Sequence, residues 1–371
     1  MGSCDSSVEN RIKKKSKLSL SNNLAEFSTN SCPSLPNLSS SNFRENYSHN
    51  LKKYNSVQKN NTIQNKQYIL PDGIAKREDI TKYYRISRKI LGDGATSIVY
   101  LAENLSKQKF AIKRIPKEKL ELRTNIILKE AEICLKLKHK NIIKYYEIYE
   151  DFHFISIVME PAEVDLFELI INSPFGYVPE EIAIDFLIQI FEVIDYLHNV
   201  VNIVHCDIKP ENFVVKFNGS KPILKLVDFG NARRKPINKE KLYKFSGTQE
   251  YMAPEAMENC GFNEKVDEWA AGIIMFNMLT GADPFIGEND IEYRDNIKFK
   301  EIKFEYIKNE RLRELNKKLL NRFMVKRISA KEALEEIKDI KKSIVFKNNI
   351  NNNKNFKDYE KKYNMVVNHR I

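Results

Sequence analysis

Short stretches in which apolar and polar residues alternate occupy the chain between residues 80 and 160, and this spacing predicts β-strands. The first two stretches are separated by a turn that contains glycines. The last is followed by Pro161, which cannot donate to a central sheet ladder. We therefore expect a strand-rich region whose strands include 83–91, 98–102, 110–113 and 154–159.

Apolar residues three or four positions apart predict helices elsewhere in the patterned part of the chain. One such stripe runs through 125–137, within the strand-rich region, and a longer one runs through 180–198. Further on, Ser329-Ala330-Lys331-Glu332 has the spacing of a capping box, in which the Ser and Glu side chains each bond to the other residue's backbone. A last helix is therefore expected to begin there.

The two ends of the chain lack both kinds of pattern. Residues 1–79 are rich in Ser, Asn and Lys with scattered apolar residues, and residues 341–371 are rich in Asn and Lys. Such segments bury too little apolar surface to offset the entropy of ordering the chain, so both are predicted to be largely disordered. The expected organisation is one folded domain over 80–340 between two basic tails.

The net charge of +11 belongs to these tails, because the segment 80–340 is formally neutral. Nucleic-acid-binding proteins carry positive charge on a folded face or interleave it with aromatic residues, and we expect neither arrangement here. Nucleic acid is therefore not an expected partner. An anionic membrane surface suits the N-terminal tail better, while the C-terminal excess is equally consistent with a plain solvated segment.

The five cysteines are scattered, and no two of them form a Cys-x-x-Cys pair. This pattern argues for a reducing compartment and against a disulfide framework or a structural zinc site. No apolar run reaches the roughly 18 residues that predict a transmembrane helix. The first residues also lack the apolar segment of a secretory signal.

The sequence starts with Met-Gly-Ser-Cys-Asp-Ser, which matches the N-myristoylation pattern with Gly2 as the acylated residue. The match also arises by chance, but Cys4 is placed to take a palmitoyl chain. One myristoyl chain binds membranes only marginally, so stable attachment needs a second signal. We expect attachment to the cytoplasmic face of a membrane with anionic lipids, with a cytosolic pool, and a basic cluster supports it: Arg11, Lys13, Lys14, Lys15 and Lys17.

The turn between the first two predicted strands contains Gly92 and Gly94. Glycines allow the backbone to lie against a triphosphate, where a Cβ would intrude. Ser97 stands where a third glycine would often be found in such a loop, and it tolerates close approach less well. Because a strand and not a helix follows, the turn does not fit a dinucleotide-binding fold.

In the next strand, Ala111 and Lys113 share one face because successive side chains of a strand alternate. That face would offer a small apolar wall to adenine and an ammonium group to phosphates. A buried ammonium needs a counter-ion, and two carboxylates of the predicted helix compete for this role. We favour Glu130 and keep Glu132 as the alternative.

The segment His205-Cys206-Asp207-Ile208-Lys209-Pro210-Glu211-Asn212 is followed by Asp228-Phe229-Gly230. Asp207 is a carboxylate able to accept the proton of a hydroxyl group. Asn212 and Asp228 add oxygen ligands of the kind that Mg²⁺ prefers, so a cation on a nucleotide phosphate could bind there. These residue types predict a phosphoryl-transfer site.

The order of these motifs, closed by Ala253-Pro254-Glu255, resembles that of the eukaryotic protein kinases over roughly residues 83–340. The positions of Lys209, two residues after Asp207, and of Thr248, ahead of Ala253-Pro254-Glu255, resemble those in serine/threonine kinases. The stretch 279–287 is similar to calcium/calmodulin-dependent and calcium-dependent protein kinases, but no EF-hand loop is found in 341–371. The resemblance implies an α+β, bilobal kinase fold, with a small, mostly antiparallel β lobe containing one helix and a larger, mostly α lobe.

The resemblance also implies transfer of the γ-phosphate of ATP to hydroxyl groups of protein substrates, with Mg²⁺ as cofactor. Asp207, Lys209 and Asn212 would be catalytic, and Asn212 and Asp228 would hold the metal. The implied nucleotide contacts are Leu91, Gly92, Gly94, Val99, Ala111, Lys113, Glu130, Met159, Glu160, Ala162 and Asp165.

Two alternatives remain from the sequence. The first is a pseudokinase, a membrane-tethered scaffold; its support is Ser97 and Cys206, the latter standing where an arginine usually precedes the catalytic aspartate. The second concerns 338–347, a basic segment with scattered apolar residues. It is either a target for calmodulin, as a further partner, or simply the end of the final helix.

Overall fold

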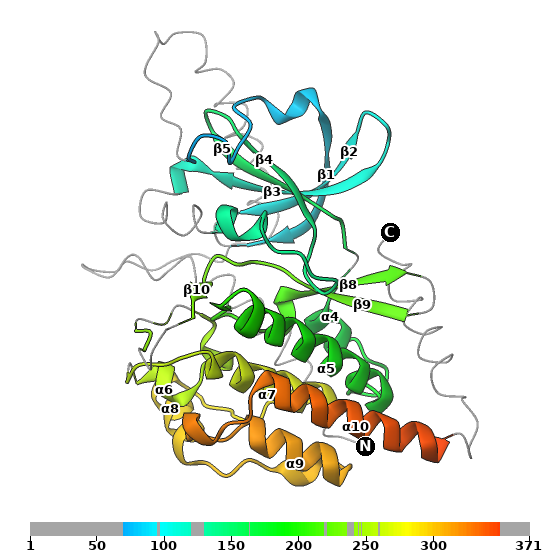
Figure 1. The fold of residues 1–371 in the computed structure, drawn as a ribbon, viewed down its shortest axis with the longest axis vertical. Coiled ribbons are helices and arrows are strands. Elements are labelled where there is room, and N and C mark those ends of the chain that lie inside the picture. Colours follow the sequence, from blue (N-terminus) through cyan, green and yellow to red (C-terminus); the bar gives the residue numbers. More distant parts are fainter. Residues whose placement is uncertain are drawn as a thin grey trace, which may run out of the picture.

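The computed structural model describes residues 70–94, 97–119, 130–162, 164–218, 221–235, 241–243, 245, 247–258 and 260–348. The predicted lipidation sites, Gly2 and Cys4, lie outside these residues. Most of the two segments predicted to be disordered also lies outside them. The described part forms two lobes, one built on a β-sheet and the other mainly helical (Figure 1), as the resemblance implied.

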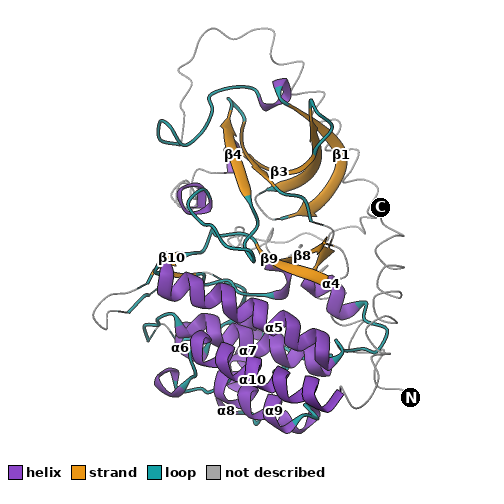
Figure 2. Ribbon diagram, turned by 45° about the vertical axis from the view of Figure 1, so that its right-hand side comes forward, coloured by secondary structure: helices purple, strands orange, loops and turns teal. Residues whose placement is uncertain are grey.

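The small lobe is a five-stranded, fully antiparallel sheet in the order β1-β2-β3-β5-β4. Figure 2 shows the sheet curving above the helices of the large lobe. The four predicted strands are confirmed; the fourth has the predicted bounds and the other three run on a few residues further, and β4 is a fifth strand for which no bounds were predicted. The strands are β1 (Tyr84–Asp93), β2 (Ile98–Asn104), β3 (Lys109–Pro116), β4 (Tyr145–Glu150) and β5 (Phe154–Met159).

Alternation along β3 sorts its side chains between two environments. Phe110 and Ile112 are buried in one apolar cluster of the sheet. Ala111 lies in a different cluster, which also contains residues of the large lobe. Because Lys113 shares the face of Ala111, its ammonium is directed toward the junction between the lobes.

Residues 70–79 belong to the folded domain, although the sequence assigned them to the N-terminal tail. Leu70 is buried, at 2% exposure, in a cluster beneath the sheet. Lys76 forms a parallel bridge to Tyr149 on β4, the edge strand. The predicted boundary at residue 80 therefore lies too far along the chain. Tyr68, Ile69 and Leu70 form a short apolar run in an otherwise polar stretch. The run shows neither the alternation nor the helical spacing that would predict the burial of Leu70.

The large lobe is built around α7, a helix in which nearly every residue is buried, including Trp269. The predicted helix 180–198 is observed as α5, which continues as a π-turn, η3 (Tyr196–Val200). The helices are α4 (Leu166–Ile171), α5 (Glu180–Asp195), α6 (Pro254–Met257), α7 (Lys265–Thr280), α8 (Asp290–Phe299), α9 (Glu310–Leu319) and α10 (Ala330–Asn348).

Short strands lie on the large lobe where it faces the small lobe. A three-stranded sheet in the order β6-β8-β9 and a two-stranded sheet of β7 and β10 lie at the top of the large lobe, close to the small lobe (Figures 1 and 2). Their bounds are β6 (Val164–Asp165), β7 (Ile203–Val204), β8 (Phe213–Asn218), β9 (Lys221–Leu226) and β10 (Arg233–Arg234).

The predicted capping box opens α10. Ser329 Oγ accepts from the backbone N of Glu332 at 3.3 Å, and Glu332 Oε2 accepts from the backbone N of Ser329 at 2.9 Å. The helix continues beyond residue 340, the predicted end of the domain, and buries Ile340. Part of the calmodulin-target pattern is thus packed on the core, which favours the reading of 338–347 as the end of the final helix.

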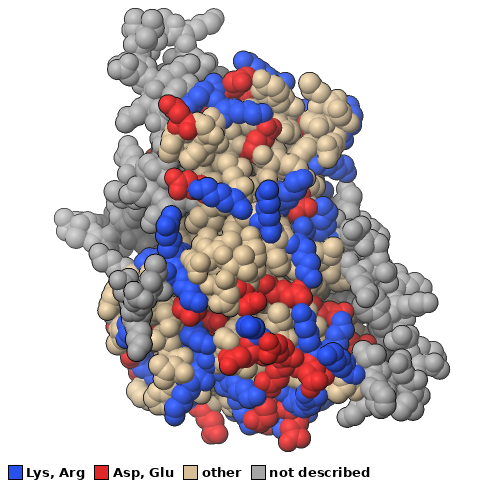
Figure 3. All heavy atoms as spheres, in the orientation of Figure 1, with Lys and Arg blue, Asp and Glu red and all other residues tan. Residues whose placement is uncertain are grey.

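Ion pairs join α10 to α5. Lys338 pairs with Glu192 at 3.0 Å, and Lys341 pairs with Asp185 at 2.5 Å. Over this face of the large lobe, basic and acidic side chains lie among one another (Figure 3). Among the described residues, no helix combines the length and the apolar character that crossing a membrane requires.

Candidate active site

The predicted lysine pair is formed at the junction between the lobes. Lys113 Nζ lies 2.7 Å from Glu130 Oε1 and 3.5 Å from Asp228 Oδ1. Glu130 is buried, and the alternative partner, Glu132, is exposed, so the structure selects Glu130. Glu130 stands in a helix whose described part is 130–134; the predicted residues 125–129 lie outside the described residues.

Burial and charge set the protonation of this group of side chains. Burial lowers the pKa of Lys113, but the carboxylates of Asp228 and Glu130 outweigh it and leave the pKa above its ordinary value. The ammonium of Lys113 in turn holds the pKa of Asp228 below its ordinary value. Lys113 is therefore a cation and Asp228 an anion at neutral pH. This arrangement is suited to an anionic ligand with a bound cation.

An apolar cluster lies beside Lys113. It joins Ala111 of β3 and Met159 of β5 to Ile143, with Val99 of β2 packed against it. The cross-strand pairs Leu101 with Ala111 and Ala111 with Met159 hold these positions in register. The predicted adenine-contacting residues Val99, Ala111 and Met159 are thus brought together by the sheet. Sequence reasoning missed four further members of the cluster: Ile143, Tyr145, Val214 and Val227.

The glycine turn joins β1 to β2 next to this cluster. Leu91 and Gly92 lie at the end of β1, and Gly92 is paired with Val99. The backbone N of Gly94 donates to the carbonyl of Ser97 at 2.9 Å. Within the described residues, a Cβ added to Gly92 or Gly94 would meet the chain at no less than 3.4 Å. No described residue therefore requires glycine at these two positions, which leaves their backbone open to a ligand.

Asp207 is held by side chains from two loops. Its Oδ1 accepts from Thr248 N at 3.1 Å and from Thr248 Oγ1 at 3.0 Å. Its Oδ2 accepts from Asn212 Nδ2 at 3.3 Å and from Asn231 Nδ2 at 3.4 Å. Lys209 Nζ donates to Thr248 Oγ1 at 2.7 Å and lies 3.7 Å from Asp207 Oδ2. The predicted catalytic residues Asp207, Lys209 and Asn212 therefore converge.

The residue before Thr248 permits this close approach. A Cβ on Gly247 would lie 2.5 Å from the carbonyl oxygen of Cys206 and 2.5 Å from the ring of Phe245. Only glycine fits there without displacing backbone. Gly247 thus lets the segment around Thr248 pack on the catalytic loop.

Asn212 and Asp228 have the donor chemistry of a magnesium site. The amide nitrogen of Asn212 donates to the carbonyl oxygen of Asp207 at 2.8 Å, which turns its Oδ1 the other way and leaves it for a cation. Asp228 is ionised and has a positive φ of 64°, a strained backbone conformation that recurs at functional sites. Mg²⁺ keeps several waters and takes only one or two protein carboxylates, so these two residues fit such a site.

The segment that links the lobes carries the remaining predicted contacts. The carboxylate of Glu160 is turned to three partners instead of a ligand, accepting from Lys144 N and pairing with Lys216 and Lys225. Its contact with a nucleotide is therefore limited to its backbone. Ala162 follows Pro161 and is half-buried. Asp165 accepts from Glu168 N at 2.8 Å and caps α4.

Asp267 of α7 clamps the backbone just before Asp207. Its Oδ2 accepts from His205 N at 2.8 Å and its Oδ1 accepts from Cys206 N at 2.9 Å. Cys206 has a φ of 64°, a left-handed conformation that costs a β-carbon residue roughly 1–3 kcal/mol. The two hydrogen bonds from Asp267 stabilise this turn and so fix the direction of Asp207.

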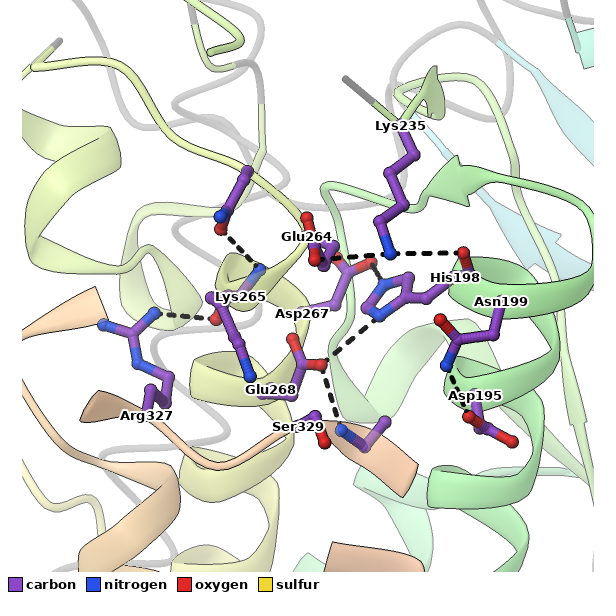
Figure 4. Close-up of polar contacts among 12 residues, drawn as sticks. Asp195, His198, Asn199, Lys235, Glu264, Lys265, Asp267, Glu268, Arg327 and Ser329 are labelled. Atoms are coloured by element: carbon purple, nitrogen blue, oxygen red, sulfur yellow. Dashed lines mark hydrogen bonds and ion pairs between the residues drawn. The ribbon is translucent and has the colours of Figure 1, made fainter. Parts of the chain in front are cut away.

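His198 joins this clamp to the last helix. Its Nε2 lies 2.8 Å from Asp267 Oδ2 and its Nδ1 lies 3.3 Å from Glu268 Oε1 (Figure 4). Glu268 Oε1 also accepts from the backbone N of Ala330, the first residue of α10, at 3.0 Å. Burial lowers the pKa of His198, but the charge of Glu268 and the hydrogen bond with Asp267 outweigh it and raise the pKa to about 10.

The raised pKa predicts a pH dependence. The ordinary pKa of histidine is 6.5, and the pKa of His198 in the folded protein is higher. Its charge therefore stabilises the fold fully below pH 6.5, and this stabilisation is lost as the pH rises through about 10. We expect the nitrogen-15 NMR signals of His198 to show an imidazolium at pH 8, assigned with a His198→Gln variant. Glu268→Gln should lower this pKa. Titration of wild-type His198 near 6.5 would contradict the prediction.

The comparisons with known proteins agree with this geometry. The protein kinase domain profile matches residues 84–337. Serine/threonine-protein kinase dkf-2 of Caenorhabditis briggsae is 35% identical over 223 residues, which are 59% of this chain and 18% of that protein. Calcium/calmodulin-dependent protein kinase type IV of Rattus norvegicus is 36% identical over 222 residues, 59% and 45% of the two chains.

Calcium-dependent protein kinase 3 of Plasmodium yoelii yoelii is 36% identical over 225 residues, which are 59% of this chain and 40% of that protein. The matched part thus spans less than half of each of these three relatives.

Proposed function

The chain belongs to the protein kinase domain family, and from this premise we propose that it is a serine/threonine kinase that transfers the γ-phosphate of ATP to hydroxyl groups of proteins. One observation carries the proposal. Lys113 is paired with Glu130 and Asp228, and Asp207 is bound by Thr248 and Asn212. The groups that such a transfer needs at the phosphates and at the acceptor are all present.

The reaction assigns each residue a part. Lys113 binds phosphate oxygens, while Val99, Ala111 and Met159 offer an apolar surface to the adenine. Magnesium, held by Asn212 and Asp228, would neutralise charge on the phosphates. The oxygen of the acceptor hydroxyl bonds to the γ-phosphorus, and Asp207 accepts the proton of this hydroxyl. At the same time the bond breaks between the γ-phosphorus and the bridging oxygen, which leaves with ADP.

Lys209 lies at the acceptor side of the site. Its Nζ is 2.7 Å from Thr248 Oγ1 and 3.7 Å from Asp207 Oδ2. From this position its positive charge faces the point at which negative charge develops on the transferred phosphoryl group. Positioning and electrostatics supply most of the acceleration in phosphoryl transfer. We therefore assign Lys209 a catalytic role, in which its charge stabilises the transferred phosphoryl group.

The second candidate, a pseudokinase scaffold, rests on two departures from the family pattern. Ser97 is buried at the base of the glycine turn. Cys206 is also buried, and burial raises the pKa of its thiol well above its ordinary value, so it is not a reactive thiolate. Neither side chain replaces a group that binds phosphate, metal or the acceptor proton, and the enzyme is therefore favoured.

The test is a transfer assay with the purified full-length protein, labelled ATP with Mg²⁺, and a generic acceptor protein. We expect phosphoserine and phosphothreonine in the acceptor. Phosphate incorporation confined to tyrosine would contradict the serine/threonine assignment. An absence of incorporation in the presence of tight nucleotide binding would favour the scaffold.

The N-terminal pattern supports a membrane-anchored form of this kinase. The match to an acylation signal at Gly2, Cys4 as a second acylation site and the basic cluster behind them all favour binding to an anionic leaflet on the cytoplasmic side. Calmodulin is a weaker candidate partner, because Ile340 is buried and Ile344 packs on the core.

A Gly2→Ala variant tests the anchor. Without an acylated N-terminus the remaining basic cluster binds only electrostatically, and its contribution is screened by salt. We expect most of the wild type in the membrane fraction and most of the variant in the soluble fraction after cell fractionation at about 150 mM salt. A Cys4→Ser variant should be released only in part. Retention of the Gly2→Ala variant in the membrane fraction would contradict anchoring through acylation at Gly2.

A further inference from the structure

The segment that enters the small lobe ahead of β1 packs against the helix that carries Glu130. Leu70, 2% exposed, is buried in one cluster with Ala131, the residue after Glu130. The rest of the cluster comes from the sheet: Ile115, Ile148, Ile155 and Ile157. Leu70 therefore belongs to the apolar cluster that joins the sheet to this helix, and Ile74 and Ala75 of the same segment also pack on it.

Polar contacts fix Leu70 in place at both of its backbone groups. Its N–H donates to Glu150 Oε2 at 3.1 Å, and its carbonyl accepts from Arg77 Nη2 at 2.7 Å. Arg77 also donates to Glu150 Oε2 at 2.6 Å. The carboxylate of Glu150 is fully buried and has a second cation, Lys117, at 2.8 Å. A buried carboxylate with two cations is a strong anchor, because removal of a partner would leave charge uncompensated.

The end of the segment is joined to the sheet edge. The backbone N of Lys76 donates to the carbonyl of Ile148, and its carbonyl accepts from Glu150 N, both at 2.9 Å. These bonds cover part of β4, which would otherwise present unpaired backbone groups as the edge strand. Residues 70–77 are thus a fixed part of the lobe, with the side chain of Leu70 directed inward.

Tyr145 extends the contact toward the nucleotide. It is packed against the cluster of Leu70, against the cluster of Ala111 and Met159, and against the core of the large lobe. Cys134, one turn after Glu130, belongs to that large-lobe core. The helix of Glu130 is therefore held on one side by the large lobe and on the other by the cluster that Leu70 completes.

From this packing we propose that Leu70 is a positioning residue, which sets the helix so that Glu130 reaches Lys113. Removing the Leu70 side chain leaves a void in the cluster that contains Ala131, and the helix can shift toward it. The 2.7 Å contact between Lys113 and Glu130 then lengthens, and the ammonium is no longer aimed at the phosphates. The inference rests on the proposed function, since it assigns this geometry to ATP binding and phosphoryl transfer.

The test uses the full chain and two readouts, the affinity for MgADP by calorimetry and kcat in the transfer assay. We expect Leu70→Ala to weaken MgADP binding and to lower kcat, each about tenfold, because small misplacements of positioning groups have large effects. Leu70→Met should restore both to within about twofold, since volume-conserving swaps are tolerated. Leu312→Ala is the matched control, a leucine buried in the large lobe, which lowers the melting temperature and leaves both readouts unchanged.

A double-mutant cycle separates positioning from stability. If Leu70 acts through Glu130, Leu70→Ala should weaken MgADP binding in the wild type and not in a Glu130→Gln background. Equal weakening in both backgrounds, or an effect matched by Leu312→Ala, would overturn the inference. Failure of the wild type to transfer phosphate would instead count against the proposed function, and the binding cycle would still decide the role of Leu70.

Discussion

Replacing Asp207 with Asn is expected to lower kcat for phosphate transfer about 1,000-fold, within the range that a positioned general base contributes. The amide cannot accept the hydroxyl proton. Its NH₂ group would also face another donor in either orientation. It would point toward Asn212 and Asn231, which donate to Oδ2 in the wild type, or toward Thr248, which donates to Oδ1. Affinity for MgADP should change by less than about threefold, because the Lys113, Glu130 and Asp228 contacts are untouched.

The measurement pairs steady-state kinetics with calorimetric binding of MgADP. Asp295→Asn is the matched control, since Asp295 is an exposed aspartate of α8, and it should retain wild-type kcat. A variant at Asp207 that keeps more than a tenth of wild-type kcat would show that another group accepts the proton. Loss of MgADP binding together with kcat would point to local misfolding instead of lost chemistry.

The sequence predicted the chemical groups of this site well, because the groups lie in short segments with local rules. Alternation placed Ala111 and Lys113 on one face of β3, and helical spacing placed an acid near Lys113. The sequence favoured Glu130 without excluding Glu132, since both belong to the same helix and tertiary packing decides which one faces inward. In the structure Glu130 is 3% exposed and Glu132 is exposed.

What the sequence did not predict depends on contacts between distant segments. The carboxylate of Glu160 is occupied by Lys216 of β8 and Lys225 of β9, a pairing set by how the small sheet meets the linking segment. Val214 and Val227 join the apolar cluster for the same reason. The short apolar run that contains Leu70 shows no strand or helix periodicity. Its burial follows from Glu150 and Arg77, which hold its backbone from elsewhere in the fold.

The Asp267 clamp connects stability with catalysis, and Asp267→Asn is expected to lower the free energy of unfolding by about 3–5 kcal/mol, the cost of breaking a buried charge pair. The Asp267 side chain is 1% exposed and accepts from His205 N, Cys206 N and His198. Both carboxylate oxygens of Asp267 accept hydrogen bonds, but the amide of Asn has only one oxygen. Its NH₂ group would therefore face one of these donors without an acceptor. Global stabilities are about 5–15 kcal/mol, and this loss is a large part of such a total.

Urea unfolding followed by tryptophan fluorescence measures the change, since Trp269 is the single tryptophan and lies two residues from the substitution. Asp339→Asn is the control, an ion-paired aspartate of α10 with a side chain 65% exposed, and it should change stability by less than about 1 kcal/mol. Because Asp267 also holds the left-handed turn at Cys206, the folded variant should show reduced kcat with nearly unchanged MgADP affinity. A change in unfolding free energy below about 1 kcal/mol would mean that the clamp does not hold the catalytic loop.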